Sequence, residues 1–229
     1  MTQTAEPLTA EMTREDILQR AEEMLPILRE RADMAEEERR LPEETVRDFH
    51  DAGLFRIIQP RRVGGYELDY GMMYELGAVV SRACASSGWN VSNLACHHWM
   101  LGMWPKQAQD EVWGRNNETS DTLICASVIF PAGKAKRVDG GYLLSGYWPF
   151  CSGIDPSDWN MLAGMVAPDG DHPEAEPRLF LVRKSDHELV DTWFTNGLQG
   201  TGSKDARATD LFVPEHMTVS GDDVKGGPT

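Results

Sequence analysis

The first half of the chain places apolar residues at helical spacing. The clearest series recurs every three or four positions, at Ile17, Ala21, Met24 and Leu28. Thr13, followed three residues later by Asp16, is a typical helix start, so we expect a helix over residues 13–38 that Pro26 kinks or splits. Further helices are expected from Pro42 to Gly53 and over about residues 70–84, 87–103 and 105–114. The pattern predicts an all-helical first half.

The pattern changes after Asn117. Short apolar runs, rich in β-branched and aromatic residues, alternate with turn residues. The Asp139-Gly140-Gly141 run between KAKRV and YLLSG indicates a hairpin. We therefore predict the α+β class, with an N-terminal all-α domain over residues 1–118 and a β-barrel or β-sandwich domain over residues 119–229 that ends in a linker.

Charge and composition exclude several function classes. The formal net charge of -15 disfavours nucleic acid and anionic membrane surfaces as partners. No window approaches the ~20 apolar residues of a membrane span, and the N-terminus does not resemble a signal peptide, so a cytoplasmic location is expected. The four cysteines lack C-x-x-C spacing and are expected to be buried free thiols, and the histidines show no metal-ligand spacing.

The segment GGYLLSGYWPFCSG (140–153) carries the strongest functional signal. A hairpin strand leads directly into aromatic residues and then a small hydroxyl residue, which is typical of a wall that holds a flat cofactor. Trp148 and Phe150 are two positions apart and are expected on one strand face. Ser152 follows them, and Ser127 lies on the first predicted strand. The alternative to a cofactor site is an ordinary structural role, in which the aromatic residues belong to the hydrophobic core and the serine hydroxyls form hydrogen bonds to nearby backbone groups.

The predicted helix over residues 87–103 carries two adjacent histidines. Spacing of four places Trp89, Asn93 and His97 on one stripe, whereas His98 lies on a neighbouring apolar stripe. A structural role for both histidines, one in the core and one at the surface, and a functional role for one of them are both open from the residues alone.

The Gly-rich run GLQGTGSKD (197–205) also has two interpretations. Its glycines, with Thr201 and Ser203 between them, could form a backbone cradle for phosphate or substrate. A tight turn between strands is the ordinary alternative.

The order of the segments ICASVIFPAG, GGYLLSGYWPFCSG and GLQGTGSKDARATDLFVPE resembles that of the acyl-CoA dehydrogenase superfamily. Two positions depart from the dehydrogenases, which usually carry T-E-P-x-A-G-S-D and W-I-T-N where this chain has residues 129–134 and Phe150-Cys151-Ser152-Gly153. The closer resemblance is to the oxygenase component of two-component flavin-dependent monooxygenases, which include the p-hydroxyphenylacetate hydroxylases. That family continues into a C-terminal four-helix bundle, which this chain is expected to lack.

The resemblance implies an enzyme that hydroxylates an aromatic, phenolic substrate through a flavin hydroperoxide. Its partners would be dioxygen, reduced FMN or FAD supplied by a separate flavin reductase, and further copies of the chain in a full-length homotetramer. A phenol has a pKa near ~10 and reacts better as phenolate, so a base with a near-neutral pKa is needed to take or share its proton. His97 is the preferred base and His98 the second choice.

The resemblance also assigns roles to the other site residues. Ser152 would bond the central-ring nitrogen of the flavin, and Ser127 would orient flavin and phenol. The implied flavin contacts are Trp89, Ser127, Trp148, Phe150, Cys151, Ser152, Thr201 and Ser203, and the implied substrate contacts are Asn93, His97 and Ser127. Pro156 stands where the family often has a histidine in S-G-x-D-H, which leaves the substrate open.

Two other functions remain as alternatives. One is an acyl-CoA dehydrogenase, against which the altered T-E-P and W-I-T-N positions argue. The other is a non-catalytic flavin-binding or scaffold remnant, which the expected lack of the bundle favours.

Overall fold

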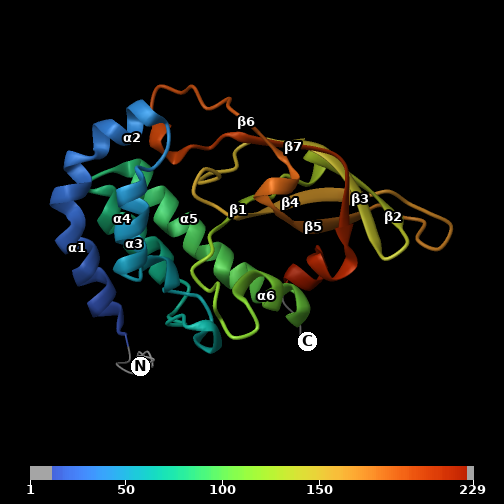
Figure 1. Ribbon diagram of the computed structural model, residues 1–229, viewed down its shortest axis with the longest axis horizontal. Helices are drawn as coiled ribbons and strands as arrows, with labels where there is room; N and C mark the ends of the chain where they lie inside the picture. Colours follow the sequence, from blue (N-terminus) through green and yellow to red (C-terminus); the bar gives the residue numbers. More distant parts are fainter. Residues whose placement is uncertain (1–11, 226–229) are drawn as a thin grey trace, which may run out of the picture.

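Six α-helices form the N-terminal part of the computed structural model, which describes residues 12–225 (Figure 1). They are α1 (Arg14–Glu30), α2 (Ala32–Glu38), α3 (Glu43–Asp51), α4 (Met72–Ser81), α5 (Ala85–Leu101) and α6 (Lys106–Trp113). Thr13 and Asp16 form the predicted capping box at the start of α1. Pro26 lies on the exposed side within α1, and the chain is instead divided between α1 and α2 at Arg31.

The helix α5 lies at the centre of the molecule, between helices α1–α4 and the sheet (Figure 1). Val91 and Leu94 are fully buried within it. Its close approach to α4 depends on Gly88, because a Cβ at this position would lie 2.8 Å from the carbonyl oxygen of Gly77. One side of α5 therefore packs against α4, which leaves another side for the sheet.

Eight strands follow the helices and form one mixed sheet. They are β1 (Ile124–Ser127), β2 (Gly133–Val138), β3 (Gly141–Trp148), β4 (Trp159–Val166), β5 (Glu176–Arg183), β6 (Glu188–Val190), β7 (Asp205–Pro214) and β8 (Thr218–Ser220). The order is β6-β7-β3-β2-β4-β5-β8, with β1 parallel to β4. Strands β2 and β3 form the predicted antiparallel hairpin, and Gly140 in its turn has the positive φ of 74° that favours glycine.

The predicted fold class is confirmed: a helical part precedes a β part. The helices end at Trp113 and β1 begins at Ile124, so the division at residues 118 and 119 stays a prediction. After β8 the described chain contains only the short turn Asp223–Lys225. Among the described residues, no helix has the length and apolar character needed to cross a membrane. The four cysteines are free thiols.

A segment far along the chain returns to the helices. The stretch between β6 and β7 extends to the end of α2, where the Glu36 carboxylate accepts hydrogen bonds from the backbone N–H groups of Gln199 (3.1 Å) and Gly200 (3.3 Å) (Figure 1). The hydroxyl of Ser86, in the first turn of α5, donates to the same carboxylate at 2.7 Å. These bonds hold the Gly-rich segment against the helical part.

Candidate functional site

The turn after β3 is the centre of the candidate site. Trp148 ends the strand with its side chain fully buried, and its indole N–H donates to the carbonyl oxygen of Ala163 at 2.6 Å. Phe150 lies beyond the strand, is 58% exposed and has a φ of 63°. The prediction that the two aromatics share a strand face is therefore wrong, because the left-handed backbone at Phe150 turns its ring away from the core.

The turn brings the predicted hydroxyl residues together. The Ser152 Oγ lies 2.7 Å from the Ser203 Oγ, which lies 2.7 Å from the Thr201 Oγ1. The backbone N–H of Gly153 donates to the Thr201 carbonyl oxygen at 2.9 Å. The Gly-rich segment, with its short turn Gln199–Thr201, therefore packs against the turn after β3 and supplies two of the three hydroxyls.

One residue of the predicted stripe on α5, Asn93, contacts this turn. The Asn93 amide donates to the Ser152 carbonyl oxygen at 3.4 Å, whereas Trp89, one helical turn earlier, is 53% exposed. Asn90, a site residue that was not predicted from the sequence, donates to the carbonyl oxygens of Gly200 and Thr201, both at 3.3 Å. Its position three residues before Asn93 on the same side of the helix was the available signal.

The two histidines are both buried, so the expectation of one in the core and one at the surface is wrong. His97 Nδ1 lies 2.7 Å from the carbonyl oxygen of Ile124, at the start of β1. Because a carbonyl oxygen only accepts, Nδ1 carries the proton and Nε2 of the neutral ring is left as an acceptor. Burial lowers the pKa of His97 to about 4, well below the near-neutral value expected of a base.

His98 has a structural environment. Its Nδ1 accepts a hydrogen bond from the indole N–H of Trp113 at 3.2 Å, and the two rings stack. Burial first, and then the neighbouring His97 and Arg56, lowers the pKa of His98 to about 3. Because Nδ1 of the neutral His98 ring is used as an acceptor, Nε2 carries the proton and no acceptor is left, so His98 is a poorer candidate base than His97.

Ser127 links the end of β1 to the turn. Its hydroxyl donates to the carbonyl oxygen of Pro149 at 2.7 Å. The next two residues, Val128 and Ile129, are 52% and 39% exposed, and the exposed ring of Phe150 follows Pro149. Polar hydroxyls therefore lie beside an exposed apolar surface, which is the combination that a flat, partly polar ligand needs.

Comparison with known proteins shows which proteins the chain resembles. Residues 8–115 match the family model "Acyl-CoA dehydrogenase, N-terminal domain". The oxygenase subunit HsaA of a flavin-dependent monooxygenase from Rhodococcus jostii is 38% identical over 203 residues, covering 89% of this chain and 52% of the relative. The p-hydroxyphenylacetate 3-hydroxylase oxygenase component of Acinetobacter baumannii is 29% identical over 219 residues, covering 96% of this chain and 50% of the relative.

Solved structures give the same result. The 3-HSA hydroxylase from Rhodococcus sp. RHA1 has a TM-score of 0.83 and 38% identity, covering 90% of this chain and 53% of that one. XiaF from Streptomyces sp., solved with FADH2 and glycerol, has a TM-score of 0.84 and 33% identity, covering 93% of this chain and 52% of that one. In sequence and fold the chain is similar to these oxygenase components of the acyl-CoA dehydrogenase-like fold. It spans about half the length of the curated relatives that it matches.

Pro156, the departure from the common pattern of these oxygenase components, lies beside a buried ion pair. The Lys204 ammonium donates to Asp155 Oδ1 at 2.7 Å, and both side chains are largely buried. Pro156 and Asp155 line a groove of about 250 Å³ together with Arg40, Leu41, Glu43 and Val46. A proline ring provides no hydrogen-bonding group at this position, so the chain differs chemically here from family members with histidine.

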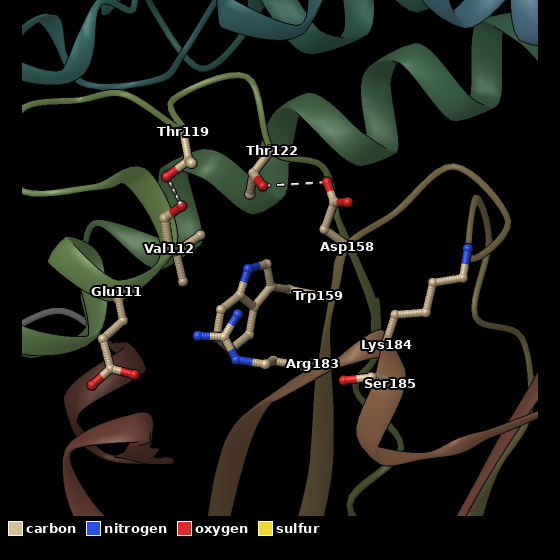
Figure 2. A pocket seen from close by; sticks show the side chains of 9 residues that line it. All are labelled: Glu111, Val112, Thr119, Thr122, Asp158, Trp159, Arg183, Lys184 and Ser185. Atoms are coloured by element: carbon tan, nitrogen blue, oxygen red, sulfur yellow. Dashed lines mark hydrogen bonds between the residues drawn. The ribbon is translucent and has the colours of Figure 1, made fainter.

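A larger groove of about 540 Å³ contains none of the site residues expected in this family of oxygenase components (Figure 2). Its charged groups already have partners: Glu111 pairs with His216, and Asp158 accepts from the Thr122 hydroxyl. The Arg183 guanidinium lies over the Trp159 ring, 4.3 Å from its centroid. The groove therefore offers no unpaired acid or base for chemistry.

Proposed function

We propose that this chain forms part of an oxygenase component that uses reduced FMN or FAD and dioxygen to hydroxylate an aromatic, phenolic substrate. The observation that carries the proposal is that the turn after β3, which presents the exposed ring of Phe150, accepts hydrogen bonds from the Ser127 hydroxyl at Pro149 and from the Asn93 amide of α5 at Ser152. The relatives named as an oxygenase subunit of a flavin-dependent monooxygenase and as the oxygenase component of a p-hydroxyphenylacetate 3-hydroxylase support the same activity.

The residues present fit a flavin ring. Such a ring needs an apolar contact for its face and a polar partner at its central nitrogens. The exposed ring of Phe150, which meets Trp193 edge to face at 6.0 Å, offers the first, and the Ser152 hydroxyl offers the second. Trp148 and Cys151 are fully buried, so we assign them to supporting the turn from within the core.

The protein groups would bind, orient and exclude water. Bound reduced flavin supplies two electrons, with which dioxygen gives one oxygen atom to the ring and the other to water. Ser127 orients the ligands, and the apolar residues Val128, Ile129 and Phe150 keep water from the reacting atoms. Trp89 and Asn93 border the same space from α5, with Asn93 bonded to the turn at Ser152.

His97 would act on the phenol as a hydrogen-bond acceptor. Its pKa of about 4 lies far below the value near ~10 of a phenol, so complete proton transfer to the buried ring is unfavourable. A hydrogen bond from the phenol O–H to Nε2 still raises the electron density of the phenol ring, which favours attack on an electrophilic oxygen. Sharing the phenol proton is therefore favoured over taking it completely.

Three further features belong to the proposal and rest on the resemblance. They are a separate flavin reductase, a homotetrameric full-length form and a cytoplasmic location. The free thiols of Cys84, Cys96, Cys125 and Cys151 favour a reducing compartment.

The test is a single-turnover reaction. The protein is loaded anaerobically with reduced FMN or FAD and mixed with oxygenated buffer containing resorcinol or p-hydroxyphenylacetate. The expected result is that a ring-hydroxylated product forms and that less hydrogen peroxide is released than in the absence of the phenol. Peroxide as the only product with every phenol would contradict the proposal, and reduction of oxidised flavin by an acyl-CoA would favour the dehydrogenase instead.

A further inference from the structure

Three buried hydroxyl groups form a continuous chain beneath the candidate site. Ser152, Ser203 and Thr201 are 7%, 4% and 2% exposed. The distance between neighbouring oxygens is 2.7 Å at both links, and the chain ends where the Thr201 hydroxyl donates to the carbonyl oxygen of Leu198 at 2.8 Å. The indole N–H of Trp193 and the backbone N–H of Thr201 donate to the same carbonyl, which fixes its position.

The carbonyl at the end sets the direction of every hydrogen bond in the chain. A hydroxyl has one proton, and a carbonyl oxygen only accepts. The Thr201 proton is therefore used on Leu198, so Ser203 must donate to Thr201. Ser203 then has no proton left for Ser152, so Ser152 must donate to Ser203.

This order leaves the Ser152 oxygen with unused acceptor capacity. Among the described residues, Ser203 is the one hydrogen-bond partner of the Ser152 hydroxyl. Its proton points inward along the chain, and its remaining lone pairs are available to a ligand at the turn after β3. A ligand that donates a hydrogen bond there gains a partner, whereas a ligand with a bare lone pair meets repulsion.

We propose that Thr201 and Ser203 are positioning residues that turn the Ser152 hydroxyl into an acceptor, and that this acceptor selects reduced over oxidised flavin. The inference rests on the proposed function for the identity of the ligand. Reduced flavin carries an N–H at the central-ring nitrogen, and oxidised flavin has a lone pair on the same atom. The hydroxyl chain thus discriminates between the two redox states of one cofactor without a charged group.

Replacing Thr201 by valine removes the group that fixes the direction while keeping the shape of the side chain. In Thr201→Val, the Ser203 hydroxyl loses the oxygen that accepts its proton, so it can donate to the Ser152 oxygen instead. The Ser152 hydroxyl then donates its own proton toward the ligand. The selectivity is measured as the dissociation constant of oxidised FMN divided by that of reduced FMN, the latter determined anaerobically. We expect the ratio of oxidised to reduced constants to fall about tenfold in Thr201→Val, and to keep its wild-type value in Thr201→Ser. Thr119→Val is the matched control, because Thr119 also donates to a carbonyl but lies away from the site.

A second measurement needs no flavin. In the wild type, the Thr201 hydroxyl proton should show scalar coupling across its hydrogen bond to the Leu198 carbonyl carbon by nuclear magnetic resonance. A Thr201 proton that donates to Ser203 would overturn the inference, as would an unchanged ratio in a folded Thr201→Val variant that binds FMN. If the coupling is present but neither form of FMN binds the wild type, the proposed function fails and so does the selection of flavin, while the hydroxyl order stands.

Discussion

His98 should make the fold sensitive to mild acid. Its neutral ring extends from α5 and is buried against Trp113 of α6, and its pKa is lowered to about 3 from an ordinary value of 6.5. A pKa that is lower in the folded state means that the unfolded chain binds the extra proton, so the stability is fully present above 6.5 and is lost as the pH falls toward 3. Each pH unit within that window removes about 1.4 kcal/mol.

Lowering the pH from about 7.5 to about 5 should therefore remove about 2 kcal/mol through His98 alone, which is a large part of a typical stability of about 5–15 kcal/mol. The assay is urea unfolding at both pH values in the wild type and in His98→Gln, whose amide oxygen can still accept from the Trp113 N–H. We expect the variant to lose about 2 kcal/mol less than the wild type. His172→Asn, at an exposed position, is the control, and equal losses in wild type and His98→Gln would refute the reasoning.

Three further outcomes follow from the structure. His97→Ala, which removes the acceptor Nε2, should lower the yield of hydroxylated product about tenfold while oxygen consumption continues as peroxide release; equal loss of both would indicate a damaged fold instead. Gly88→Ala should cost about 1–3 kcal/mol in urea unfolding, because its Cβ would lie 2.8 Å from the Gly77 carbonyl oxygen, and no loss would show that α4 and α5 can separate freely. Phe150→Gly should be about 1 kcal/mol more stable than Phe150→Ala, because glycine adopts the φ of 63° without strain. Equal stabilities of the two variants would contradict the strain argument. Both variants should bind flavin more weakly than the wild type.

Local signals in the sequence were sufficient for most of the fold. The capping box at Thr13 depends on residues three positions apart, and the hairpin turn at Gly140 depends on two adjacent glycines. Such features form from neighbouring residues and need no tertiary information. The burial of both histidines was not predictable in the same way, because amphipathic reasoning assumes one solvent face, whereas α5 packs on α4 and also contacts β1.

The candidate site depended more on long-range contacts. Ser152 was chosen by resemblance to a family and Ser203 from the Gly-rich run, but the two residues are 51 positions apart, and their hydrogen bond follows only from the return of the Gly-rich segment to the turn. The exposed position of Phe150 depends on a left-handed backbone, which a phenylalanine rarely adopts and no pattern indicates. Residue types thus identified the site, whereas tertiary packing determined which side chains meet.

The contacts that orient the site also hold the two parts of the molecule together. Glu36 on α2 accepts from the backbone of Gln199 and Gly200, and Asn90 on α5 donates to the carbonyl oxygen of Thr201. Both contacts act on the segment that carries the hydroxyl chain. Since a shift of this segment would move Ser203 away from Ser152, the attachment of the helices to the sheet and the direction of the Ser152 hydroxyl depend on the same few hydrogen bonds. The site is therefore a property of the interface between helices and sheet, and neither part contains it alone.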